Sequence, residues 1–114
     1  MQQAAKLDLP AFDPLGSTGA IRIQRLPEEP GLYLFQAKDR PAYVAQTENL
    51  RHRIERHFQY SGSHGLPDWL FGSRPPRLSL CIAVLPGVGA SMRRAFELKA
   101  ISLYTPDWNV SRVA

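Results

Sequence analysis

Two apolar segments joined by a short polar connection constrain this sequence more than any other feature. Residues 31–37 (GLYLFQA) and 42–47 (AYVAQT) are rich in aromatic and aliphatic side chains, and only four turn-forming residues separate them. Such segments are typical of strands, and so short a connection joins them as an antiparallel hairpin. Because side chains alternate along a strand, Tyr33 shares a face with Phe35, and Tyr43 shares a face with Ala45.

The hairpin leads directly into a predicted helix. Leu50, Ile54 and Phe58 repeat at the four-residue spacing of one helix face. Thr47 is placed to cap the helix, and Gly62 and Gly65 are expected to end it.

A third strand and a second helix follow. Residues 77–85 (RLSLCIAVL) alternate well enough for a strand, and residues 86–89 (PGVG) form a turn. Ser91 is expected to cap a helix that runs to about Tyr104 and is closed by Pro106. The order strand, strand, helix, strand, helix predicts an α+β domain on a three-stranded sheet.

The first part of the chain carries weaker signals. Residues 1–27 contain several Pro and Gly breakers, and Ile21 to Ile23 is at best a short strand. We expect residues 1–27 to be an arm that packs on the domain or connects it to something else. Residues 28–112 are then the domain proper.

Composition limits the classes of partner. A chain of 114 residues supports one core, and it has no apolar run long enough for a membrane span and no signal peptide pattern. The lone Cys81 excludes an internal disulfide, so a cytoplasmic protein is expected. The net charge is +4, with 11 Arg against 3 Lys, which suits phosphate contacts but also arises in GC-rich genomes. Nucleic acid is a permitted partner on this basis, not a required one.

Glu97 is difficult to explain as a purely structural residue. In the second helix Phe96, Ala100, Leu103 and Tyr104, with Met92, form a broad apolar face, and Glu97 falls at its edge. A carboxylate beside a core is costly unless it is paired, hydrogen-bonded or bound to a metal. An ion pair with Arg93, one turn earlier, and a functional carboxylate are both open interpretations.

The first helix poses a similar question. Arg53 and His57 flank its apolar stripe, where an arginine can lie over the core edge and a histidine can be partly buried. His52 and His57 are five residues apart on different faces, and no paired-Cys pattern exists, so a structural zinc site is excluded.

Several segments together resemble the GIY-YIG nuclease family, which includes domains of excision-repair incision proteins and intron homing endonucleases. Pro30-Gly31-Leu32-Tyr33 and Ala42-Tyr43-Val44-Ala45 resemble the two signatures that name it. Residues 46–54 (QTENLRHRI) resemble the entry to its first helix. Glu97 followed by Asn109 resembles its C-terminal signature, so the resemblance covers about residues 28–112.

The resemblance implies a central three-stranded antiparallel sheet flanked by helices and Mg²⁺- or Mn²⁺-dependent cleavage of DNA. Glu97 would be the metal ligand, and Tyr43 would activate the attacking water near Tyr33 and His57. A tyrosine is a poor base at neutral pH unless a neighbouring cation favours its anion. Arg53 would neutralise the scissile phosphate. Asn109 would order the site by hydrogen bonds.

Other expectations concern DNA contacts and departures from the family. Arg51, Arg56 and Gln46 are candidate DNA-binding residues, although Gln46 stands where a basic residue often occurs, and Ala45 replaces a glycine. These two departures leave a catalytically degenerate nucleic-acid-binding module as an alternative, and a structural partner-binding domain as a lesser one. So small a domain would need a further DNA-recognition domain or subunit for sequence specificity.

Overall fold

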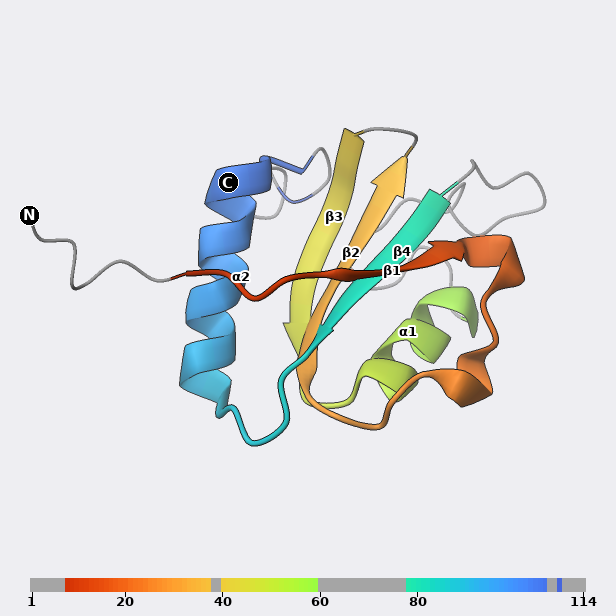
Figure 1. Ribbon diagram of the computed structural model, residues 1–114, viewed down its shortest axis with the longest axis horizontal. Coiled ribbons are helices and arrows are strands. Elements are labelled where there is room, and N and C mark those ends of the chain that lie inside the picture. Colours follow the sequence, from red (N-terminus) through yellow and green to blue (C-terminus); the bar gives the residue numbers. More distant parts are fainter. Residues whose placement is uncertain (1–7, 38–39, 60–77, 107–108, 110–114) are drawn as a thin grey trace, which may run out of the picture.

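The sheet of this domain has four antiparallel strands in the order β1-β4-β2-β3. The computed structural model describes residues 8–37, 40–59, 78–106 and 109 (Figure 1). Its elements are β1 (Asp13–Ser17), the 3₁₀ helices η1 (Thr18–Ala20) and η2 (Ile23–Arg25), β2 (Gly31–Ala37), β3 (Arg40–Thr47), α1 (Leu50–Gln59), β4 (Leu78–Val84) and α2 (Ala90–Tyr104). The α+β class and the β2–β3 hairpin are therefore confirmed.

The prediction of three strands was wrong by one, because β1 adds a fourth beside β4. It pairs antiparallel with β4 from Asp13 opposite Ile82 to Ser17 opposite Ser79, with an irregularity between Pro14 and Gly16. All five residues of β1 are exposed. A strand held only by its backbone leaves no apolar alternation in the sequence, so its pattern could not reveal it.

The segment of the predicted arm that follows β1 also contacts the domain. Residues 23–25 form the 3₁₀ helix η2, not the short strand considered for Ile21 to Ile23, and Leu26 is buried in the core. Arg51 of α1 holds this segment, because its guanidinium donates to the carbonyl oxygens of Gln24 and Leu26 at 2.9 Å each. A boundary at residue 28 stays a prediction.

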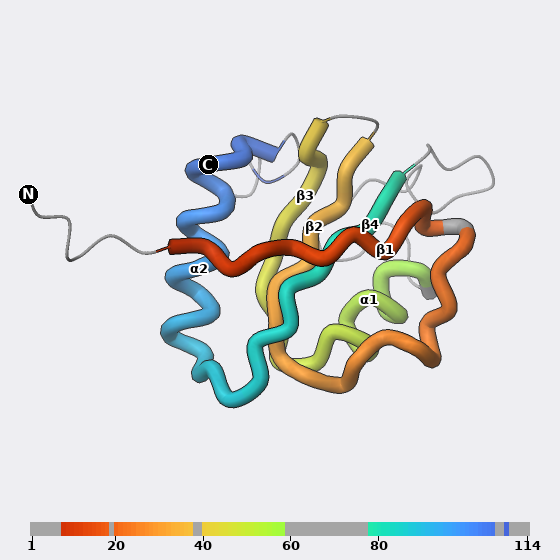
Figure 2. The backbone as a smooth tube through the Cα atoms, viewed as in Figure 1, coloured from red at the N-terminus to blue at the C-terminus, as the bar shows by residue number. Residues whose placement is uncertain are grey.

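The two helices cover opposite faces of the sheet (Figure 2). On the α1 side, the strand residues Tyr33, Phe35, Tyr43, Ala45, Leu78, Leu80 and Ile82 pack with Leu50 and Ile54. On the α2 side, Leu34, Val44 and Cys81 pack with Ala100. The predicted sharing of a face by Tyr43 and Ala45 is confirmed. Neither helix has the length and apolarity that a membrane span requires.

Both predicted helix caps were wrong. Asn49, not Thr47, caps α1, because its Oδ1 accepts the His52 N–H at 3.0 Å, while Thr47 accepts the N–H of Asn49. α2 begins at Ala90 after Gly89 with no side-chain cap, so Ser91 lies inside the helix. α2 ends at Tyr104 as predicted, whereas Gly62 and Gly65 lie outside the described residues.

The orientation of α2 about its axis also differs from the predicted apolar face. Met92 and Leu103 are 47% and 61% exposed, while Arg93 and Ala100 are buried. The reason is polar: Arg93 and Glu97 both hydrogen-bond to Gln46 of β3. These contacts favour a rotation of α2 that turns Arg93 inward, which a wheel of apolar residues cannot anticipate.

Gly31 is required where β2, β4 and α1 meet. A Cβ at this position would overlap the carbonyl oxygen of Ala83 and would lie 2.9 Å from Cδ1 of Leu50. Gly31→Ala should therefore lower the free energy of unfolding by about 1–3 kcal/mol, the usual cost of overpacking, measured by urea denaturation.

Gly89→Ala is the matched control, because a Cβ there meets nothing within 4 Å. Because Gly89 is the N-cap of α2, where alanine is less favourable, we expect Gly89→Ala to cost about 0.5–1 kcal/mol, without the overlap that Gly31→Ala creates. Equal stability of the two variants would show that the close approach at Gly31 is not a constraint.

Candidate active site

Side chains from outside the sheet form hydrogen bonds with the backbone groups on the outer edge of β3. β3 ends the strand order, so alternate backbone groups point away from β2 and need other partners. The Val44 N–H donates to Asn109 Oδ1 at 2.8 Å, and Asn109 Nδ2 donates to the Val44 carbonyl at 2.9 Å. Two residues further along, the Gln46 N–H donates to Glu97 Oε2 at 3.2 Å. Asn109 and Glu97 thus stand side by side along this edge.

The carboxylate of Glu97 has two protein partners. Besides the Gln46 N–H on Oε2, Arg94 Nη1 lies 3.3 Å from Oε1. The ion pair with Arg93 considered from the sequence does not form. Arg93 instead donates to Gln46 Oε1 at 3.0 Å and to the Val88 carbonyl at 2.6 Å. The side chain of Glu97 is 13% exposed, so it lies within reach of water.

The aromatic cluster lies on the α1 side of the hairpin. Tyr33 and His57 are each 1% exposed, and the tyrosine hydroxyl lies 2.8 Å from His57 Nε2. The ring of Tyr43 is centred 6.2 Å from that of Tyr33 and 6.1 Å from that of His57. The cross-strand register explains this cluster, because Tyr33 lies opposite Ala45, two positions from Tyr43.

The two groups of side chains meet in one pocket of about 190 Å³. The residues that line it are Tyr33, Tyr43, Ala45, Gln46, Arg53, Arg94 and Glu97. The tyrosines belong to the α1 face and Glu97 comes from α2 on the other face, so they can share a pocket only around the edge of β3. Four of the six predicted catalytic residues line this pocket. Of the other two, His57 contacts Tyr33, and Asn109 holds Val44.

The predicted DNA-binding residues separate into two groups. Gln46 lines the pocket, and Arg56 lines an adjoining hollow of about 460 Å³ that shares Arg53 with it. Arg51 lies elsewhere: besides its two backbone acceptors it forms a 3.1 Å ion pair with Glu28. Its position indicates a structural role that ties η2 to α1. Sequence reasoning missed Arg94, although its spacing of three residues before Glu97 is the signal for a helical pair.

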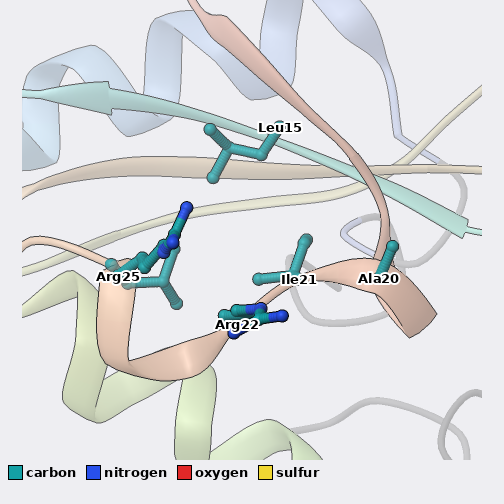
Figure 3. Close-up of a pocket in the computed structure, with 6 residues that line it drawn as sticks. Leu15, Ala20, Ile21, Arg22 and Arg25 are labelled. Carbon is teal, nitrogen blue, oxygen red and sulfur yellow. The ribbon is translucent and has the colours of Figure 1, made fainter.

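Another hollow lies beside β1, at the opposite edge of the sheet (Figure 3). Its volume is about 260 Å³, and it is lined by Leu15, Ala20, Ile21, Arg22, Arg25 and Leu26. None of these residues is a carboxylate or a histidine. It therefore offers no side-chain ligand for a cation, unlike the pocket at β3.

The donor set of the β3 pocket fits a single hard cation. Within residues 8–37, 40–59, 78–106 and 109, no three His, Cys, Asp or Glu side chains cluster, so the described residues hold no metal site made of protein ligands alone. Among the described residues that line the pocket, Glu97 is the one carboxylate. Mg²⁺ keeps several waters and is often held by one or two carboxylates, so Glu97 with water is a sufficient ligand set.

Asn109→Ala removes two hydrogen bonds from the edge of β3. Each buried backbone group left without a partner costs about 1–3 kcal/mol, so we expect a loss of at least about 2 kcal/mol in the free energy of unfolding. Urea denaturation measures it. The exposed Ser102→Ala in α2 is the control and should be neutral. A variant as stable as the control would contradict the assigned contacts.

Comparison with known proteins gives one consistent result. No family model matches the chain. It is 39% identical to UvrABC system protein C of Aquifex aeolicus over 49 residues, which are 41% of this chain. It is 40% identical to the same protein of Deinococcus radiodurans over 40 residues, which are 35% of this chain. Those matches cover only 9% and 6% of the two relatives.

Solved structures resemble the chain over a larger part. One is a crystal structure of the GIY-YIG N-terminal endonuclease domain of UvrC from Thermotoga maritima, a point mutant bound to its catalytic divalent cation. It matches this chain with a TM-score of 0.57 and 26% sequence identity, and the match covers 75% of this chain and 88% of that chain. The same domain bound to magnesium has a TM-score of 0.57 at 24% identity, covering 75% and 89%. The chain therefore shares the fold of the GIY-YIG N-terminal endonuclease domain of UvrC, and part of it is similar in sequence to UvrC proteins.

Proposed function

We propose that this domain is a divalent-metal-dependent endonuclease that hydrolyses phosphodiester bonds of DNA in the pocket at the edge of β3. One observation carries the proposal: among the described residues, a tyrosine pair from the hairpin, one arginine from each of α1 and α2, and the carboxylate of Glu97 line the same pocket. The similar UvrC domain is described as an endonuclease with a catalytic divalent cation, which supports the same class of reaction.

The residues have distinct roles in this proposal. Glu97 would hold Mg²⁺, with Mn²⁺ as the alternative, and the bound cation would stabilise the negative charge that builds on phosphate oxygens. Arg53 contributes a second positive charge from α1. Tyr43 lines the pocket and is the candidate to receive the proton of the attacking water at its phenolate oxygen.

Tyr33, His57 and Asn109 position the reacting groups. The Tyr33 hydroxyl and His57 Nε2 are hydrogen-bonded at 2.8 Å behind Tyr43, so they fix the cluster against which its ring packs. Asn109 holds Val44, the residue after Tyr43, by both of its backbone groups. Catalytic geometry depends on such support, since a small displacement of a reacting group costs much of the rate.

The two departures from the family do not favour the alternative of a degenerate binding module. The Ala45 side chain is 6% exposed and belongs to the core on the α1 side. Gln46 contributes its backbone N–H to Glu97 and its side-chain oxygen to Arg93, so its lack of charge leaves the carboxylate supported. Both substitutions are compatible with a working pocket.

The biological setting is a proposal of wider scope. Since the curated relatives are many times longer than the matched segments, the domain is proposed to act as the catalytic module of a larger DNA repair, restriction or mobile-element system. Recognition of the DNA site would come from another domain or subunit, because so small a pocket has little surface for base contacts.

Glu97→Gln tests the proposed function directly. The amide keeps the shape of the side chain but loses the charge that holds a cation, so cleavage should fall by about a hundredfold or more. Initial rates are measured on nicked, branched and duplex DNA with Mg²⁺ or Mn²⁺, with Glu97→Ala in parallel. Glu55→Gln, on α1 and outside the lining of the pocket, is the matched control and should cleave as the wild type does. Equal rates for Glu97→Gln and wild type, or no cleavage with either metal, would refute the proposal.

A further inference from the structure

Arg94 lines the pocket at the edge of β3 and has no role in the proposed reaction. Its side chain is 66% exposed, lines the pocket and ends 3.3 Å from Glu97 Oε1, three residues along α2. It differs from its neighbour Arg93, which is buried and held by Gln46 and Val88. Arg94 is thus the more loosely held of two adjacent guanidinium groups.

The two oxygens of Glu97 are held in different ways. Oε2 accepts the N–H of Gln46, a backbone group fixed by the β2–β3 pairing, and Arg93 fixes the side chain of the same residue. In the part of the chain that the structure describes, Arg94 alone contacts Oε1. The carboxylate therefore keeps one rigid contact if Arg94 leaves, so its orientation does not depend on the ion pair.

A divalent cation at Glu97 competes with Arg94. Both are positive and both are attracted to the same carboxylate, so a cation held by Glu97 would repel the Arg94 guanidinium beside it. An exposed ion pair between long side chains contributes only about 0–1 kcal/mol, so Arg94 can move away at small cost. After moving, its guanidinium still belongs to the pocket, where Arg53 of α1 also lies.

We propose that Arg94 exchanges partners during the reaction cycle. In the metal-free protein it is the counter-ion of Glu97, and with the cation bound it turns to a non-bridging phosphate oxygen of the DNA strand. This inference rests on the proposed function. The planar guanidinium suits it, because it binds carboxylate and phosphate with the same donor geometry. The cation and the substrate are then coupled, since loading Glu97 releases a ligand for the phosphate.

The first test is cation affinity without DNA. Mn²⁺ is titrated calorimetrically at low ionic strength into wild type, Arg94→Ala, Arg94→Lys and Lys99→Ala. Arg94→Ala should bind Mn²⁺ about two- to fivefold more tightly, the range expected for losing an exposed competing pair, and less so at high salt. Arg94→Lys, which retains a charge, should stay closer to wild type. Lys99→Ala removes one charge from the same helix away from the pocket and should not differ.

The second test is DNA affinity with and without Ca²⁺. It is measured by the fluorescence anisotropy of a labelled duplex, and gel electrophoresis checks that the duplex is not cleaved. Without Ca²⁺, Arg94→Ala should bind DNA nearly as wild type does, because in the wild type Arg94 is paired with Glu97 and does not contact the phosphate. With Ca²⁺, it should bind severalfold more weakly and its salt slope should fall by about one. Lys99→Ala should show no such dependence on Ca²⁺.

The outcomes separate this inference from the proposed function. If wild type binds Mn²⁺ and Glu97→Gln does not, yet Arg94→Ala leaves Mn²⁺ affinity unchanged, the exchange is refuted while the metal site stands. A DNA defect of Arg94→Ala that is equal with and without Ca²⁺ refutes the exchange in the same way. If wild type binds no divalent cation, both proposals fail.

Discussion

The rest of the site depends on the unpaired edge of β3. A strand at the end of a sheet exposes backbone donors and acceptors that must find partners, and here the partners are Asn109 and Glu97. The same contacts bring residues from the C-terminal part of the chain to the hairpin that carries the tyrosines. A requirement of backbone hydrogen bonding thus places a carboxylate in the same pocket as Tyr43, and it also explains why a charged residue of α2 lies mostly buried against the sheet.

This arrangement resolves a geometric difficulty. Tyr33 and Tyr43 belong to the face covered by α1, whereas Glu97 comes from the helix on the other face, and a sheet separates the two layers. At the edge strand β3, side chains from both layers reach the same pocket. The position of β3 at the end of the order is therefore a functional property of the topology as well as a structural one.

The sequence predicted the elements whose signals are local. The hairpin, α1, β4 and the end of α2 were found because apolar repeats and prolines mark them. β1 was missed because its exposed residues pair through the backbone alone, and the rotation of α2 was missed because Arg93 and Glu97 contact β3. Four of the six predicted catalytic residues and the predicted DNA-binding residue Gln46 meet in one pocket, but the resemblance to a family, not spacing alone, assigned their roles. Arg94 was overlooked because it belongs to no signature.

The contacts that complete the pocket also affect how the domain folds. The β2–β3 hairpin joins residues close in sequence, whereas Asn109 reaches Val44 across 65 residues and β1 reaches β4 over a similar span. Closing long loops costs chain entropy before the contacts repay it, so such pairings form late. A nascent chain would therefore carry the tyrosine hairpin before it carries a place for a cation. The pocket at the edge of β3 would be complete only once Glu97 and Asn109 have both left the ribosome.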